Sequence, residues 1–228
     1  MKNKEIGTVA VGSMCLGMVQ TNCYFVFKED GKDHSSNTNV ESEELTPVIV
    51  FDPADRGELI YNELKKRGFR VAAIYLTHAH FDHIGGVDDL RKLSGAKVFV
   101  YEKEKRLCED PSYNLSIDYG MNLTVKPDKY LTDGEICEDA GLKFKLIATP
   151  GHTEGSCCYY FEEGNILISG DTLFEGSVGR TDFPTGSMSQ LVRSCHDKLF
   201  VLPDNTVVYP GHGETTTIGY EKMYNSFL

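Results

Sequence analysis

The sequence lacks three features that would each indicate a different class of protein. No apolar run approaches the roughly 20 residues that cross a bilayer. The seven cysteines include no CxxC pair and their number is odd, so we interpret most of them as small core residues in a reducing compartment. Basic residues are in deficit, with 23 Lys and Arg against 34 Asp and Glu. We therefore expect a cytoplasmic protein whose main partner is neither a nucleic acid nor a membrane, because both select a cationic face.

A chain of 228 residues is long enough to bury a full core. Glycines interrupt the opening stretch MKNKEIGTVAVGSMCLGMVQ, which we interpret as a first strand rather than a secretory signal. A polar insertion at about residues 28–47 separates the runs NCYFVF and VIVFD, which we expect to pair as a hairpin. Apolar runs then alternate with helix-like segments. The pattern predicts one α/β sandwich domain over residues 1–228, and nothing in it indicates an oligomeric state.

These further elements follow from apolar periodicity and from the position of glycines. The predicted strands are 71–77, 97–101, 143–149, 157–161, 165–169 and 206–210, and the predicted helices are 55–69, 87–95, 102–110 and 187–200. Leu59, Ile60 and Leu64 should share the buried face of the first helix. Met188, Leu191, Val192, Cys195 and Leu199 should form the apolar stripe of the last.

The segment LTHAHFDHIGG concentrates metal-binding side chains directly after a buried strand. His78 and His80 are two residues apart, so an extended backbone points both imidazoles to one side. Asp82 and His83 follow in a turn that two glycines help to complete. One short loop therefore offers ligands for two ions. Imidazole suits zinc, iron or manganese, and a carboxylate can bridge two ions.

The same arrangement recurs at three later strand ends, where His152, Asp171 and His212 each stand close to a glycine. A lone His or Asp after a strand is most often a cap or turn residue. Capping does not explain why five of the seven histidines share one context. The other two have ordinary explanations: His34 is expected to be solvated in the polar insertion, and His196 to lie at the surface of a helix. We interpret the recurring residues as a metal site.

THAHFDHIGG together with the downstream PGHTEGS, SGDTLF and YPGHGETT resembles the metallo-β-lactamase superfamily over about residues 22–217. Within that superfamily, GDTLFEGSVGRTDFPTG resembles the glyoxalase II-like hydrolases and the related persulfide dioxygenases. The resemblance implies a four-layer αββα sandwich with the site at one edge of its two sheets.

The resemblance also implies the role of each site residue. The implied ligands are His78, His80 and His152 on a first ion, Asp82, His83 and His212 on a second, and Asp171 as a bridge between them. The ions would be two divalent metals, zinc in first place with iron or manganese as alternatives. Asp82 and Asp171 are the candidate catalytic residues. Arg180 is the candidate substrate-binding residue, although an ion pair with Asp182 is nearly as good an explanation for it.

The implied activity is hydrolysis of a small-molecule thioester, such as a hydroxyacylglutathione of the S-lactoylglutathione type, by a metal-bound hydroxide. Sixteen residues follow His212, whereas the fuller glyoxalase II enzymes have a C-terminal helical region that helps to bind glutathione. We therefore expect a single domain without that region and a more open site, and the sequence leaves the use of glutathione open.

Three alternatives to thioester hydrolysis involve the same residues. A persulfide dioxygenase would hold one ferrous ion with His78, His152 and Asp171, a 2-His-1-carboxylate triad. β-Lactam hydrolysis is disfavoured, because the β-lactamases generally lack an aspartate at the place of Asp171. A purely structural metal site is disfavoured as well, because structural zinc sites are normally closed cages rich in cysteine.

Overall fold

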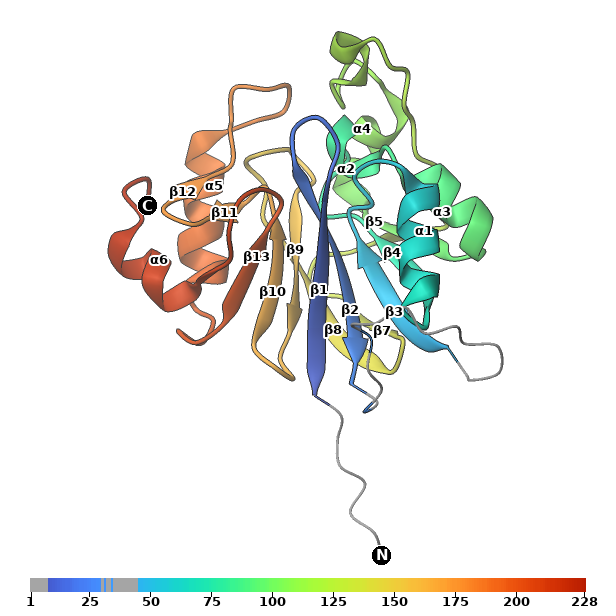
Figure 1. Cartoon of the computed structure of the whole chain (residues 1–228). Helices are drawn as coiled ribbons and strands as arrows, with labels where there is room; N and C mark the ends of the chain where they lie inside the picture. The colour runs from blue at the N-terminus through green and yellow to red at the C-terminus, as the bar shows by residue number, and fades with distance from the viewer. Residues whose placement is uncertain (1–7, 30, 32–33, 35–44) are drawn as a thin grey trace, which may run out of the picture.

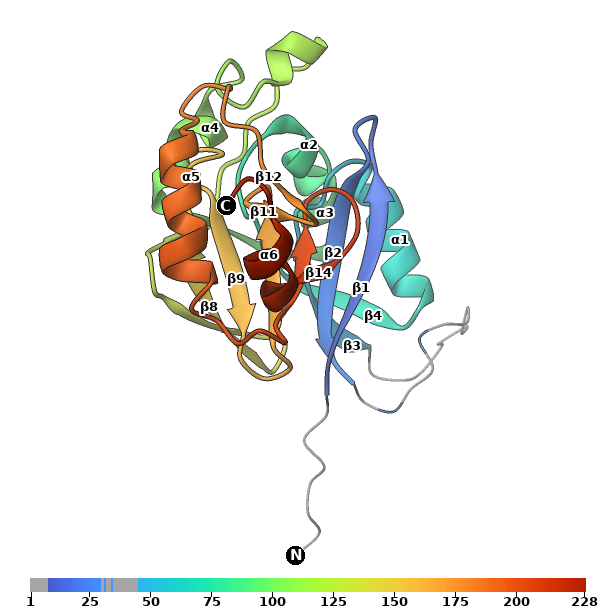
Figure 2. The same cartoon turned by 90° about the vertical axis from the view of Figure 1, so that its left-hand side faces the viewer.

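Two six-stranded sheets face each other and helices cover their outer surfaces (Figure 1). This computed structural model describes residues 8–29, 31, 34 and 45–228. The first sheet has the order β1-β2-β3-β4-β5-β6, and the second has the order β14-β13-β10-β9-β8-β7. The view from the side shows α5 outside one sheet and α1 outside the other (Figure 2). The predicted αββα sandwich is confirmed.

The first sheet begins antiparallel and continues parallel. Its strands are β1 (Val9–Leu16), β2 (Thr21–Lys28), β3 (Thr46–Phe51), β4 (Phe69–Tyr75), β5 (Lys97–Tyr101) and β6 (Lys129–Leu131). The predicted pairing of the runs on either side of the polar insertion is confirmed, since β2 and β3 are antiparallel with Tyr24 opposite Phe51. Most of the insertion, at 30, 32–33 and 35–44, lies outside the described residues.

The second sheet is antiparallel except for one parallel pair, β10 with β13. Its strands are β7 (Ile136–Asp139), β8 (Leu142–Ala148), β9 (Cys157–Phe161), β10 (Ile166–Gly170), β13 (Val207–Pro210) and β14 (Thr216–Thr217). A separate two-stranded hairpin, β11 (Leu173–Phe174) with β12 (Ser177–Val178), follows β10. The sequence analysis did not predict β6, β7, β11, β12 or β14, because these strands are short or lack a long apolar run.

The helices are α1 (Gly57–Lys66), α2 (Phe81–Ile84), α3 (Val87–Ser94), α4 (Lys105–Glu109), α5 (Met188–Ser194) and α6 (Ile218–Tyr224). Short 3-10 turns occupy Glu102–Glu104 and Ser116–Tyr119, and a π turn over Cys195–Leu199 extends α5. The helix α3 ends as predicted at Gly95, which adopts a left-handed φ of 71° as a C-terminal cap. None of the helices in the described part of the chain has the length and apolarity to cross a bilayer.

The core lies in three apolar layers that alternate with the layers of the sandwich. Aromatic side chains, among them Phe51, Tyr75, Phe144 and Tyr159, fill the space between the sheets. A second cluster joins the first sheet to α1 and α3, and a third joins the second sheet to α6 and to the π turn that extends α5. The central strand β3 is almost entirely buried because both of its faces are covered. All seven cysteines are free and only Cys15 is exposed, as expected for core residues.

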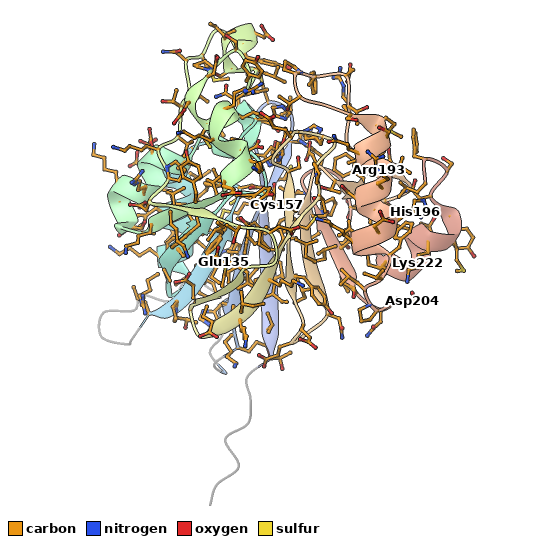
Figure 3. The ribbon with its side chains drawn as sticks, turned by 180° about the vertical axis from the view of Figure 1, so that it is seen from behind. Glu135, Cys157, Arg193, His196, Asp204 and Lys222 are labelled. Carbon is orange, nitrogen blue, oxygen red and sulfur yellow. The ribbon has the colours of Figure 1, made fainter. Side chains whose placement is uncertain are left out.

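Three side-chain predictions were wrong. Leu59 and Met188 are exposed, so the buried stripes of their helices are narrower than periodicity suggested. His34 is half-buried rather than solvated, because its ring stacks on Phe69 at a centroid distance of 4.1 Å. His196 lies at the surface as predicted, on the outward side of the helical segment seen in Figure 3.

Candidate metal centre

Four strand ends bring the predicted ligands to one edge of the sandwich. The loop with His78 and His80 follows β4, and α2 adds Asp82 and His83. From the second sheet, His152 follows β8, Asp171 follows β10 and His212 follows β13. Ligand atoms of His78, His80 and His152 lie within 4.8 Å of one another, and the same holds for Asp82, His83 and His212. Residues from both sheets therefore form two adjacent groups.

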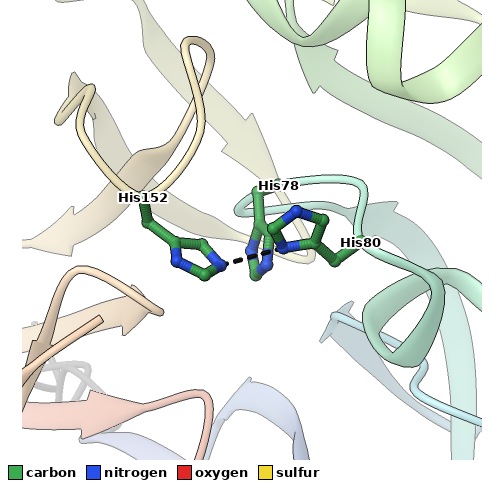
Figure 4. Close-up of side chains that lie close together, drawn as sticks. All are labelled: His78, His80 and His152. Carbon is green, nitrogen blue, oxygen red and sulfur yellow. Dashed lines mark hydrogen bonds between the residues drawn. The ribbon is translucent and has the colours of Figure 1, made fainter. Parts of the chain in front are cut away.

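The three histidines of the first group point their rings at a common centre (Figure 4). The Nδ1 atom of His80 lies 2.9 Å from the Nε2 atom of His152. On its other side, the Nδ1 atom of His152 lies 2.6 Å from the backbone oxygen of Arg180. Because a carbonyl only accepts hydrogen bonds, Nδ1 of His152 is the protonated nitrogen. The lone pair of its Nε2 therefore faces the cluster.

Asp171 lies between the two groups. Its Oδ1 is 3.4 Å from Nε2 of His83, and its Oδ2 is 3.5 Å from Nε2 of both His152 and His212. Asp82 approaches Nε2 of His83 at 3.4 Å and Nε2 of His212 at 3.3 Å. Two ligands that each stand about 2.0–2.1 Å from one tetrahedral zinc ion are about 3.4 Å apart. The observed spacings thus fit ligands that share an ion.

Several ligand atoms are buried without a hydrogen-bond partner: Nε2 of His78, His80 and His83, and Oδ1 of Asp171. A buried polar atom that leaves water without a new partner costs free energy, so proteins rarely leave one unpaired. Four of them within the two adjacent ligand groups indicate that cations supply the missing interactions. The donor set of imidazoles and carboxylates fits zinc, iron or manganese.

The electrostatics of the site prepare it for a cation. Burial, together with neighbouring imidazoles, lowers the pKa of His78 and lowers that of His80 to about 3, so both are neutral at pH 7. Burial opposes ionisation of Asp82 and Asp171, but the nearby histidines outweigh it and lower both pKa values. Asp82 and Asp171 are therefore anionic and His78 and His80 are neutral, which are the protonation states that bind metals.

His212 and His83 differ from the other ligand histidines. Burial would lower the pKa of His212, but Asp82 and Asp171 outweigh burial and raise it. His83 is the stronger case. Burial would lower its pKa, but the carboxylates of Asp82, Asp171 and Asp52 outweigh burial and raise the pKa well above the usual value. Its Nδ1 lies 2.9 Å from Oδ2 of Asp52. A proton on His83 balances these acidic groups as long as no metal does so.

Asp52 was not predicted from the sequence, yet its carboxylate contacts the candidate site. It follows β3, and its carboxylate accepts hydrogen bonds from the backbone N–H and the hydroxyl of Thr77 at 2.8 and 2.6 Å, besides its contact with His83. Outer partners of this kind orient metal ligands. The signal was present, since VIVFD also ends an apolar strand in a carboxylate. Thr21, which donates to Oδ2 of Asp82 at 2.6 Å, had no comparable signal.

Glu104 links the ligand loops of the two sheets. It is fully buried and accepts hydrogen bonds from the N–H of Ala79 and the hydroxyl of Thr153, both at 2.8 Å. Ala79 stands between His78 and His80, and Thr153 follows His152. Burial raises the pKa of Glu104 to about 7. No pattern in its charged helical segment had indicated this role.

Gly211 is required by a close approach. A Cβ atom at this position would lie 2.1 Å from Oδ1 of Asp171 and 2.8 Å from Cε1 of His83. Any side chain would therefore displace the carboxylate between the two groups.

Arg180 lies at the rim, with its side chain 66% exposed. Its guanidinium pairs with Asp182 through two hydrogen bonds of 3.0 and 2.7 Å and covers the ring of Phe183 at 4.1 Å. The ion pair considered as the alternative explanation is thus present. The backbone oxygen of Arg180 accepts the hydrogen bond from Nδ1 of His152 and so orients that ring, a role that the sequence did not reveal. Binding of substrate by the guanidinium stays a prediction.

Known proteins resemble this chain in sequence. The model of the metallo-beta-lactamase superfamily matches residues 40–212. The probable metallo-hydrolase YqgX of Bacillus subtilis (strain 168) is 36% identical over 217 residues, 94% of this chain and 95% of that protein. The hydroxyacylglutathione hydrolase GloC of Haemophilus influenzae is 34% identical over 184 residues, 79% of this chain and 87% of that protein.

Solved structures resemble it as well. BLEG-1, described as a B3 metallo-beta-lactamase, superimposes with a TM-score of 0.86 at 37% identity, over 96% of this chain and 99% of that one. TTHA1623 in a di-iron-bound form gives a TM-score of 0.78 at 32% identity, over 95% and 100%. The chain belongs to the metallo-β-lactamase superfamily. It is a metallo-hydrolase of that superfamily, with a metal site built from histidine and aspartate.

Proposed function

We propose that the protein hydrolyses a small-molecule thioester of the hydroxyacylglutathione type, for which S-lactoylglutathione is the model. The observation that carries the proposal is the position of Asp171, within 3.5 Å of histidines from both ligand groups. A site for two ions suits hydrolysis of an acyl bond. The relative named hydroxyacylglutathione hydrolase GloC supports the choice of substrate.

Two divalent ions held by these seven residues would lower the pKa of a bound water from about 15.7 towards about 7 and so supply hydroxide at neutral pH. Asp171 sets the separation of the two groups, because its two oxygens face different histidines. Asp82, held by the hydroxyl of Thr21, is placed to orient the attacking oxygen. We propose zinc as the metal, with iron or manganese as alternatives.

The substrate would approach from the side of His212. The side chain of His212 is 29% exposed, and those of Asp82 and Asp171 are 13% and 11% exposed. By contrast, His78, His80, His83 and His152 are buried. The ligands that a substrate can reach are therefore on the side of His212.

The test combines metal analysis with three assays. Protein produced with balanced zinc, manganese and iron is analysed by elemental mass spectrometry, then assayed with S-lactoylglutathione, a chromogenic cephalosporin and a persulfide. We expect about two ions per chain, release of thiol from the thioester and little β-lactam cleavage. One iron per chain with oxygen consumption on the persulfide would overturn the proposal in favour of a dioxygenase. Preferential cleavage of the cephalosporin would overturn it in favour of a β-lactamase.

A further inference from the structure

A small cavity of about 70 Å³ lies beside the metal centre, beneath the turn that joins β1 to β2. Met18 and Val19 line it from the turn, Phe81 and Asp82 from α2, and Met121 and Leu123 from the segment before β6. Figures 1 and 2 both show the turn and α2 at the same end of the molecule, where the ligand loops also lie.

One side chain, that of Asp82, is shared by the cavity and the candidate metal centre. Asp82 is part of its wall and also belongs to the ligand group with His83 and His212. The turn above it is anchored at its base, because Thr21 donates to Asp82 and the N–H of Asn22 donates to the oxygen of Gly211 at 2.7 Å. The position of the cavity relative to the metal site is therefore fixed by hydrogen bonds.

The walls favour an apolar occupant. Met18 and Val19 are 71% and 38% exposed at the tip of the turn, so nothing in the described chain covers them fully. The ring of Phe81 stacks on Tyr119 at 4.1 Å and extends the apolar wall. The volume of the cavity limits the size of the occupant. A water molecule occupies about 30 Å³, and a methylene group is of about the same size, so a cavity of about 70 Å³ holds two or three carbon atoms.

We propose that this cavity, here named the acyl pocket, receives the alkyl part of the acyl group and restricts the enzyme to short acyl thioesters. The inference rests on the proposed function and names its substrate class. The group bonded to the carbonyl carbon must lie next to the residue that orients the nucleophile, and Asp82 forms the wall there. A thiol carrier such as glutathione is too large and too polar for this space, and binds outside it.

Binding of carboxylic acids tests the pocket without requiring turnover. Acetate, propionate, butyrate and hexanoate are titrated by calorimetry into the metal-loaded protein, as analogues of the acyl product. We expect the Kd to fall by about four-fold for each added methylene up to butyrate, with no further gain for hexanoate. A Kd that stays level from acetate to butyrate overturns the pocket.

Variants at the exposed turn test whether its side chains form the wall of the acyl pocket. Val19→Phe narrows the pocket and should lower the ratio of kcat/KM for butyryl over acetyl thioesters of one carrier by about ten-fold or more. Met18→Ala removes part of the wall and should weaken butyrate binding several-fold. Met223→Ala is the matched control, because this methionine is also 71% exposed but lies on α6 outside the pocket.

The outcomes separate the two proposals. If the preference among acyl groups stays at the parent value in both Val19→Phe and Met18→Ala, the pocket is overturned and the proposed function stands. Graded acid binding without turnover of any thioester keeps the pocket and overturns the proposed function. If Val19→Phe changes the preference among thiol carriers instead of acyl groups, the occupant is the thiol and the inference is wrong.

Discussion

The two sheets contribute to the metal centre in different ways. The first sheet supplies four candidate ligands from one six-residue stretch, His78–His83, which follows a single strand. The second supplies three, His152, Asp171 and His212, from the ends of three different strands. The first contribution depends on local backbone geometry. The second depends on the order of strands in a sheet, so its precision must come from contacts between residues far apart in the sequence.

The contacts around the site reflect this difference. In the first sheet, the neighbouring strand fixes the ligand loop: Asp52, at the end of β3, accepts a hydrogen bond from Thr77 and contacts the ring of His83. The second sheet places Asp171 by close backbone approach at Gly211. Glu104 then ties the two contributions together. Variants at these positions therefore separate the two mechanisms of placement.

The largest effect is expected at the residue that joins both groups. Asp171→Ala should reduce the metal content from about two ions per chain to one or fewer, because it removes a ligand atom near each group. Activity should fall by more than the roughly 100-fold that loss of an outer partner costs. Elemental analysis and thioester assays measure both. Unchanged metal content and turnover would contradict the assignment of Asp171.

Gly211→Ala tests placement by the second sheet. The added Cβ would meet Oδ1 of Asp171 at 2.1 Å, so we expect metal affinity to fall by about 100-fold. Competition with a chromophoric chelator measures the change. Gly213→Ala is the control, since Gly213 lies in the same loop and has open space at its Cβ position, although its φ of 76° makes alanine more strained there than at Gly211. Equal losses in both variants would show that any added methyl group in this loop, rather than contact with Asp171, is responsible.

Asp52→Asn tests placement by the first sheet. Asparagine tolerates the positive φ of 48°, but its amide group must face one of the three donors that now point at the carboxylate. We expect a loss of about ten-fold in metal affinity, smaller than for Gly211→Ala. Asp88→Asn on the exposed surface of α3 is the control. An affinity equal to that of the parent protein would show that Asp52 does not position His83.

Glu104→Gln tests the link between the sheets through the pH dependence of the free energy of unfolding. The folded pKa of about 7 exceeds the ordinary 4.5, so the folded protein retains a proton that the unfolded chain releases. The stabilisation is complete below about pH 4.5 and is lost as the pH rises through about 7, by roughly 3 kcal/mol. Urea unfolding of metal-free protein at pH 5 and pH 8 should show this dependence in the parent and a weaker one in Glu104→Gln. Identical dependences would contradict it.

Arg180→Ala should have the smallest effect on folding. Both members of its ion pair are about two-thirds exposed, and exposed pairs contribute little because water and salt screen them. The unfolding midpoint should not change. If the guanidinium binds substrate, KM should rise while kcat stays level, and Asp182→Ala, which frees the guanidinium, should not raise KM. An unchanged KM in Arg180→Ala would remove Arg180 from the substrate site.

Local patterns were sufficient to predict most elements and the residues of the candidate site. The spacing of His78 and His80 on extended backbone, the glycines after strand ends and the apolar runs of β5, β8 and β9 all act over a few residues. The same approach failed for Leu59 and His34, because their exposure depends on what packs against them.

The sequence by itself therefore determined the class of fold, the residues that the structure brings together as a candidate metal site and the polar composition of its loops. Only the tertiary structure decided that His152, Asp171 and His212 meet the first loop, since β13 pairs in parallel with β10 after an intervening helix. It also decided the roles of Asp52, Glu104 and Gly211. Dihedral preferences and periodicity are local properties of the chain, whereas the contacts of Asp52 and Glu104 join residues 25 to 49 positions apart. Only the packed sheets bring these residues together.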